Sequence, residues 1–138
     1  MNALEVTATF NGGYSATVEA RGHTIAVDEP ESTGGADDGV MPTELLAASL
    51  ASCFALALGH VSRRDGAELP GLRVDVRAER AGRELRYGRL IVTAHAEVPA
   101  AELAAHVERA QRLCWVSNTL SQPPEIEYRA TEDSCLSD

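Results

Sequence analysis

Alternating apolar and polar positions mark three short strands at the start of the chain. Residues 4–10 (LEVTATF), 14–20 and 23–27 alternate in this way and are rich in β-branched types, which is typical of half-buried strands. Asn11-Gly12-Gly13 separates the first two runs and Gly22 separates the next, and glycine at such positions favours tight hairpin turns. The pattern therefore predicts an N-terminal antiparallel meander.

A long apolar run follows an acidic, glycine-rich loop. Residues 45–58 (LLAASLASCFALAL) carry no charge. Pro42 suits the first turn of a helix and Glu44 adds favourable charge there, so we predict a helix over 42–62. This helix is apolar on nearly every side, which favours burial, for example between two subunits. A membrane-spanning helix needs about 20 apolar residues, so we interpret the run as a buried central helix.

The second half of the chain shows two more strands and a second helix. Residues 72–80 and about 87–98 alternate again and predict a second β pair. An amphipathic helix is predicted over about 100–114, with Cys114 on its apolar stripe. A final short strand is predicted over Glu125–Arg129. Separate blocks of strands and helices are typical of an α+β fold, and we expect residues 1–138 to form a single domain.

The net charge of the chain limits the kinds of partner that we expect it to bind. The formal net charge is −9, and all twelve basic residues are arginine. An acidic protein is repelled by phosphate backbones and by anionic membrane surfaces, so we expect neither nucleic acid nor a membrane as a partner. The absence of lysine from the sequence excludes a Schiff-base lysine.

The remaining composition indicates a cytoplasmic thiol protein. The N-terminus lacks a basic, signal-like region and continues directly into alternating residues. Three cysteines occur without a CxxC pair, and Cys135 lies in the polar tail. The histidines lack metal-ligand spacing and Gly34-Gly35 lacks a nucleotide-binding pattern, so we expect neither metal nor cofactor.

Cys53 and Cys114 are the residues that could carry chemistry together. Each lies on one of the two long predicted helices, and two helices of one small core must pack together or across a dimer interface. Their Cα atoms could then approach within the ~4.4–6.8 Å that a disulfide needs. The alternative is that both are small core hydrophobes, since free cysteine is among the most buried residue types.

Two segments resemble the signatures of the OsmC/Ohr superfamily. Residues 28–58 (DEPESTGGADDGVMPTELLAASLASCFALAL) resemble its Gly-Gly loop, Pro-x-Glu-Leu helix start and first cysteine, and residues 114–120 (CWVSNTL) resemble its second-cysteine segment. The resemblance implies an OsmC-like fold, an intertwined homodimer, and reduction of organic hydroperoxides and hydrogen peroxide. It implies that Cys53 is the peroxidatic cysteine and Cys114 the resolving one, with a dithiol reductant reopening their disulfide.

The group that would activate Cys53 is less clearly indicated. Family peroxidases use an arginine near the first cysteine, oriented by a glutamate at the helix start, but residues 28–53 contain no arginine. Arg21 is the only arginine before Arg63, so Arg21 and Glu44 are the candidates for these two roles. An apolar pocket around Leu50, Phe54 and Trp115 would favour organic peroxides.

Two other functions remain open from the sequence. The first is a non-catalytic module that binds an apolar ligand at the dimer interface, with both cysteines lining the pocket; the missing loop arginine favours it. The second is a thiol hydrolase or acyl-transfer enzyme that uses Cys53 with His60, seven residues later and on roughly the same helix face.

Overall fold

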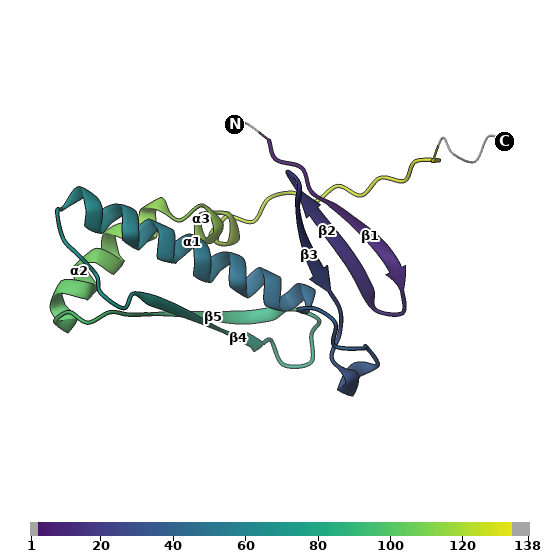
Figure 1. The fold of residues 1–138 in the computed structure, drawn as a ribbon, viewed down its shortest axis with the longest axis horizontal. Coiled ribbons are helices and arrows are strands. Elements are labelled where there is room, and N and C mark those ends of the chain that lie inside the picture. The colour runs from purple at the N-terminus through teal and green to yellow at the C-terminus, as the bar shows by residue number, and fades with distance from the viewer. Residues whose placement is uncertain (1–2, 134–138) are drawn as a thin grey trace.

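The fold, given by a computed structural model that describes residues 3–133, is a mixture of helices and antiparallel strands (Figure 1). Cys135 lies outside the described residues. The elements in chain order are β1 (Thr7–Gly12), β2 (Ser15–Ala20), β3 (His23–Val27), α1 (Pro42–Arg64), β4 (Arg73–Arg80), β5 (Tyr87–His95), α2 (Ala100–Ala110) and α3 (Trp115–Ser121). Two short 3₁₀ turns, η1 (Glu31–Thr33) and η2 (Gln111–Leu113), precede α1 and α3. The predicted α+β class is confirmed.

The predicted N-terminal meander is confirmed as a three-stranded sheet in the order β1-β2-β3. The β2–β3 hairpin turns through Arg21 and Gly22, whose φ angles are +50° and +83°. Positive φ at both central positions gives a turn whose twist matches that of the strands, and glycine adopts it without strain. The sheet stands at one end of the molecule, beside the start of α1 (Figure 1).

The loop before α1 is organised around Asp28. This side chain is buried, and its carboxylate accepts hydrogen bonds from the backbone N–H groups of Glu29 (2.7 Å), Ala36 (3.3 Å) and Asp38 (3.1 Å). The chain passes so close to itself that a Cβ on Gly35 would lie 1.9 Å from the Glu29 carbonyl oxygen. The loop therefore holds the end of β3 in a fixed relation to the start of α1.

One face of α1 forms the core. Its buried residues pack against β4, β5 and the α2–α3 segment, and Leu58 is completely buried. The other face is open, and Leu56 is 75% exposed. By length and composition α1 would also fit a membrane span, but its packing against strands and helices on one side is that of a core helix. We predicted that α1 would be buried on nearly every side, but within a single chain only one of its faces is buried.

The predicted second helix is confirmed but ends earlier than expected, and one predicted strand is wrong. The helix predicted over 100–114 ends at Ala110. Cys114 follows the η2 turn with an extended backbone (φ −85°, ψ 103°), which separates that turn from α3. Periodicity did not reveal this break because the apolar spacing continues through it. The strand predicted over 125–129 is not formed, since these residues pair with no strand within the described chain. A β-strand requires a hydrogen-bonded neighbour as well as alternation.

We expect Asp28→Asn to destabilise the protein at neutral pH and to change its response to acid. The three backbone N–H groups hold the pKa of the Asp28 carboxyl below its usual value, outweighing burial, which raises it. Stability from a lowered pKa is present above the unfolded value and is lost as pH falls through the folded one. Urea midpoints of the wild type and the variant should therefore differ at pH 7 and converge below about pH 4.

Asp37→Asn is the matched control for this prediction, because Asp37 is exposed on the same loop. Its urea midpoint should follow that of the wild type across the range. Equal midpoints for Asp28→Asn and the wild type at pH 7 would show that the loop does not depend on this carboxylate.

Candidate functional site

The two predicted site cysteines lie together in the structure. Cys53 is half-buried on α1, whereas Cys114 is completely buried at the junction between η2 and α3. Cys53 packs against the core cluster that contains Cys114, and its thiol is among the neighbouring groups that lower the pKa of the Cys114 thiol. The fold thus brings two thiols from distant parts of the sequence into contact, although Cys114 lies at a helix start rather than on the predicted helical stripe.

The surroundings of Cys114 favour its thiolate. Burial raises the pKa of the Cys114 thiol, but hydrogen bonds from the Ser117 hydroxyl, from the backbone N–H groups of Ser117 and Val116, and from the Cys53 thiol together lower it below its ordinary value. Each of these groups stabilises the charged sulfur by donating to it. Among the described residues, the groups responsible are neutral, so this lowering needs no cation.

The other predicted site residues do not join the cysteine pair. Glu44 closes the start of α1, where its Oε1 accepts the Met41 backbone N–H at 2.9 Å. Glu44 lies nine residues before Cys53, about 13 Å along the helix axis, and therefore acts as a capping residue in this chain. Arg21 is exposed at the β2–β3 turn. His60 is exposed, about two turns beyond Cys53.

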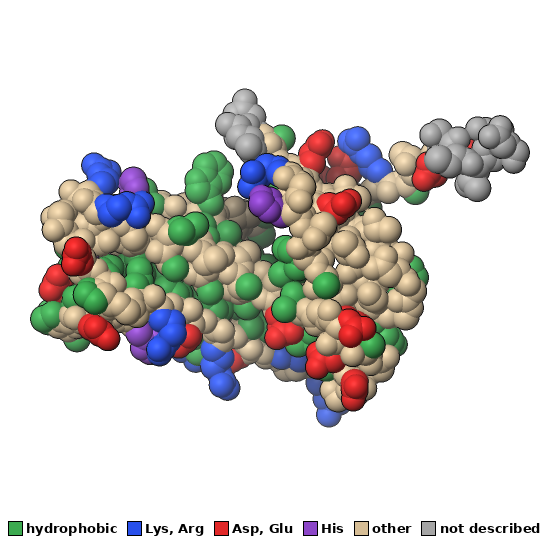
Figure 2. Space-filling model, viewed as in Figure 1, with side chains coloured by type: hydrophobic (Ala, Val, Ile, Leu, Met, Phe, Trp, Pro, Cys, Tyr) green, Lys and Arg blue, Asp and Glu red, His purple; other side chains and the backbone are tan. Residues whose placement is uncertain are grey.

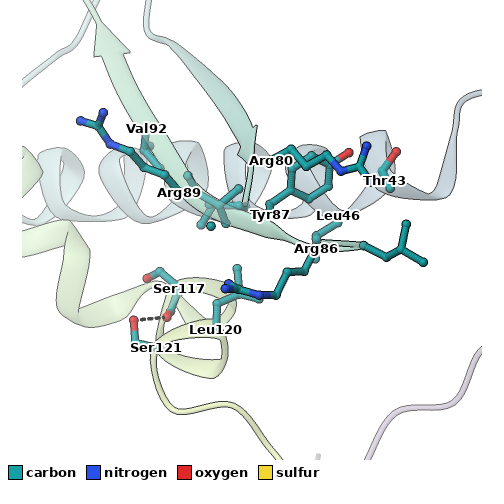
Figure 3. Close-up of a pocket in the computed structure, with 14 residues that line it drawn as sticks. Thr43, Leu46, Arg80, Arg86, Tyr87, Arg89, Val92, Ser117, Leu120 and Ser121 are labelled. Atoms are coloured by element: carbon teal, nitrogen blue, oxygen red, sulfur yellow. Dashed lines mark hydrogen bonds between the residues drawn. The ribbon is translucent and has the colours of Figure 1, made fainter. Parts of the chain in front are cut away.

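A large cavity lies near the cysteine pair, but neither cysteine lines it, contrary to the expectation for a ligand-binding module. It has a volume of about 950 Å³ and lies between α1, the β4–β5 hairpin and α3 (Figure 3). Leu50, one turn before Cys53, and Ser117, beside Cys114, both line it. Most of its wall is apolar, whereas three arginines from the hairpin supply charge. The lining residues are Thr43, Leu46, Leu50, Arg80, Leu85, Arg86, Tyr87, Gly88, Arg89, Leu90, Val92, Ser117, Leu120 and Ser121.

The sequence analysis located this cavity only in part. Leu50 lines it as expected, but Phe54 is buried in the core and Trp115 is 80% exposed and is not part of the wall. The arginines at positions 80, 86 and 89 were missed as site residues. Their recurrence along one hairpin was a visible signal, but only folding brings that hairpin over α3 (Figure 3).

The arginines are partly engaged with neighbouring acceptors. Arg86 pairs with Glu84, and an Arg89 Nη1 lies 3.5 Å from Glu79. Arg80 donates to the backbone carbonyls of the β4–β5 turn. Within residues 3–133, no group of three His, Cys, Asp or Glu side chains is arranged to hold a metal ion.

The α+β fold, the thiol pair and the nearby apolar cavity are those of a small thiol protein. Comparison with known families identifies the family to which the chain belongs. The sequence profile of the family described as OsmC-like protein matches residues 35–129. The chain therefore belongs to the OsmC-like family, within the OsmC/Ohr superfamily. No protein with a curated description matches it.

Solved structures support the same assignment. An organic hydroperoxide resistance protein from Elizabethkingia anophelis, with thiocyanate bound, is 26% identical, with a TM-score of 0.66, over 89% of this chain and 91% of that one. An OsmC-like protein from Mycoplasma pneumoniae is 21% identical, with a TM-score of 0.72, over 89% and 91%. An organic hydroperoxide resistance protein OsmC from Legionella pneumophila is 24% identical, with a TM-score of 0.65, over 87% and 90%.

We expect mild oxidation to join Cys53 to Cys114 within one chain. Because Cys53 already packs against the cluster that contains Cys114, diamide should form this bond with little backbone movement. The experiment uses a Cys135→Ser background, and peptide mapping under non-reducing conditions identifies the bond. Cys53→Ser and Cys114→Ser in that background should each retain one free thiol. A product dominated by linked chains would contradict the contact.

Proposed function

We propose that this protein reduces organic hydroperoxides through the Cys53–Cys114 pair. The contact between the two thiols is the observation that carries the proposal. The cavity beside them offers an apolar surface to the organic part of a substrate. Relatives described as organic hydroperoxide resistance proteins share the fold, which links the family to this class of substrate.

The chemistry proceeds in two displacement steps. The Cys53 thiolate attacks the terminal peroxide oxygen: an S–O bond forms, the O–O bond breaks, and the alkoxide takes a proton to leave as an alcohol. The Cys114 thiolate then attacks the sulfenic acid on Cys53, forming the S–S bond and releasing hydroxide, which is protonated to water. A dithiol reductant returns the disulfide to two thiols. The partner thiol traps the sulfenic acid before it reaches irreversible oxidation states.

We place this chemistry in the cytoplasm, where reducing conditions keep the thiols available for turnover. The acidic charge of the chain gives no support to nucleic acid or a membrane as a partner. The cavity accounts for a preference for organic over small polar peroxides, because burying apolar surface contributes about 25 cal/mol per Å².

We further propose that the protein works as an intertwined homodimer. Strand register places Ala8, Phe10, Val18 and Ile25 on one face of the β1–β3 sheet and Thr7, Thr9, Thr17 and Thr24 on the other. The apolar face is uncovered: Phe10 is 72% exposed and Ile25 is 41% exposed.

The sheet also makes no substantial contact with α1, α2 or the β4–β5 pair within the described chain. Figure 2 shows further hydrophobic side chains gathered across the middle of the molecule, between this sheet and the rest. Exposed apolar surface on this scale is uncommon on a soluble monomer. A second copy would supply the missing cover for both regions and a neighbour for residues 125–129.

The peroxidase proposal predicts that one equivalent of cumene hydroperoxide removes two thiols per chain and leaves a Cys53–Cys114 disulfide. Thiol counting with a chromogenic disulfide and peptide mapping measure this outcome. Cys53→Ser should abolish the reaction because it removes the attacking sulfur. Cys114→Ser should stop at a sulfenic acid on Cys53, which dimedone traps.

The competing function is non-catalytic binding of an apolar ligand in the same cavity. It is favoured by the position of Arg21, which lies at an exposed turn of the N-terminal sheet rather than among the groups that surround the thiol pair. Thermal stabilisation by an apolar ligand, with all thiols intact after peroxide treatment, would establish this function in place of the peroxidase.

The dimer proposal predicts a solution mass twice the 14.7 kDa of one chain, measured by light scattering. Ile25→Glu should lower the mass to that of a monomer, because it puts a charge on the apolar face. Thr24→Glu is the matched control, since Thr24 is the neighbouring exposed residue on the opposite face; it should leave the dimer intact. A monomeric wild type would overturn the proposal.

A further inference from the structure

We propose that His106, Asp65 and Arg109 form a proton-dependent clamp between the end of α1 and α2. The clamp is closed while His106 is an imidazolium and weakens when this ring loses a proton. His106 is 5% exposed, and within residues 3–133 its Nε2 is the one buried side-chain nitrogen or oxygen that has no hydrogen bond. Such atoms are rare in folded proteins, so the groups around the ring must account for its burial.

Both ring nitrogens of His106 face oxygen atoms that accept hydrogen bonds. Nδ1 lies 2.9 Å from the Glu102 backbone carbonyl oxygen, and Nε2 lies 3.5 Å from Oδ2 of Asp65. A neutral imidazole has a single N–H, so either tautomer turns a lone pair toward one of these oxygens. An imidazolium carries a proton on both nitrogens. The geometry therefore favours the charged ring.

Asp65 connects this ring to a second cation. Asp65 is the residue at which α1 ends, and its Oδ2 also accepts a hydrogen bond from Nη2 of Arg109, three residues after His106 on α2. Among the described residues, no charged side chain of β4, β5 or α3 forms an ion pair with these three. The other basic residues in the last turn of α1, Arg63 and Arg64, are exposed. One carboxylate therefore holds two cations across the gap between the helices.

Two effects oppose a charge on His106, and both are limited. Burial disfavours the charged ring, but the charged ring is also the form that leaves no lone pair facing an acceptor. The Arg109 charge repels an imidazolium, but the Arg109 side chain is 50% exposed, so water screens this repulsion. The Asp65 carboxylate faces the buried ring directly and favours its charged form.

The clamp lies between the two parts of the core that carry the cysteines. Cys53 lies on α1, and Cys114 lies eight residues after His106, beyond η2. Because the protonated ring is the form that pairs with Asp65, the stabilisation is present at low pH and is lost as pH rises and the ring loses its proton. We therefore expect the α2–η2 segment to open from α1 more readily in alkaline solution, whether or not the protein reduces peroxides.

Alkylation of Cys114 by iodoacetamide measures this opening, because Cys114 is completely buried and reacts only when the segment opens. A Cys53→Ser, Cys135→Ser background leaves Cys114 as the only thiol. His106→Gln in this background should speed alkylation about tenfold at about pH 6, the effect of one lost bond between charged groups. The difference should narrow toward about pH 9, as His106 loses its proton in the unsubstituted background. Comparing the two proteins at each pH removes the effect of the ionisation of the thiol itself.

Three further variants in the same background separate protonation from packing. Asp65→Asn removes the anion and should narrow in the same way as His106→Gln. Arg109→Gln should speed alkylation by a similar factor at every pH, because arginine keeps its charge throughout. His95→Gln is the matched control: His95 pairs with Asp75 at 3.0 Å, but this pair is exposed, so the alkylation rate should not change.

Two outcomes of the alkylation experiment overturn the inference. If His106→Gln speeds alkylation equally at every pH, the residue acts through packing and not through its proton. If His106→Gln leaves the rate unchanged at about pH 6, the ring does not hold the helices together.

Ring-nitrogen chemical shifts test the charge of His106 without substituting it. In a protein with His23→Gln, His60→Gln and His95→Gln, His106 is the only histidine. After ¹⁵N-histidine labelling, its two ring nitrogens should give imidazolium shifts at about pH 6 and the shifts of a neutral ring in alkaline solution. A neutral ring at about pH 6 in the folded protein overturns the inference, whatever the alkylation rates show.

Discussion

The packing of the η2–α3 junction against α1 is the interaction on which the site depends. It buries Cys114 completely and holds it against Cys53, which lies 61 positions earlier in the sequence. The junction is neither helix nor strand at Cys114, so the sulfur is surrounded by backbone N–H groups that a continuous helix would have used internally. These donors outweigh the effect of burial on the pKa of the Cys114 thiol.

The groups that lower the pKa of a thiol in this site act on Cys114 and not through an arginine. In this chain the groups that lower the pKa of Cys114 are a hydroxyl, a thiol and two amides, all neutral. Neutral donors stabilise a buried anion without adding an unpaired charge of their own. The cationic side chains instead surround the adjoining cavity, on the β4–β5 hairpin (Figure 3).

The single chain buries one part of its apolar surface and leaves another part uncovered. One face of α1 is covered by β4, β5, α2 and α3, while the apolar face of the β1–β3 sheet has no cover (Figure 1). The sheet is uncovered because it lies outside the core that α1 forms with the other elements. The proposed second copy would cover this surface.

The sequence by itself determined the meander, the β4–β5 pair, the position of α1 and the two cysteines worth considering, because alternation, turn residues and an uncharged apolar run act locally. Only the tertiary structure decided that the helix breaks before Cys114, that residues 125–129 lack a neighbour within the described chain, and that Glu44 caps α1. These features depend on which distant segment supplies a hydrogen-bond partner or a packing surface. Periodicity carries no information about such partners, because it records only which side of an element is apolar.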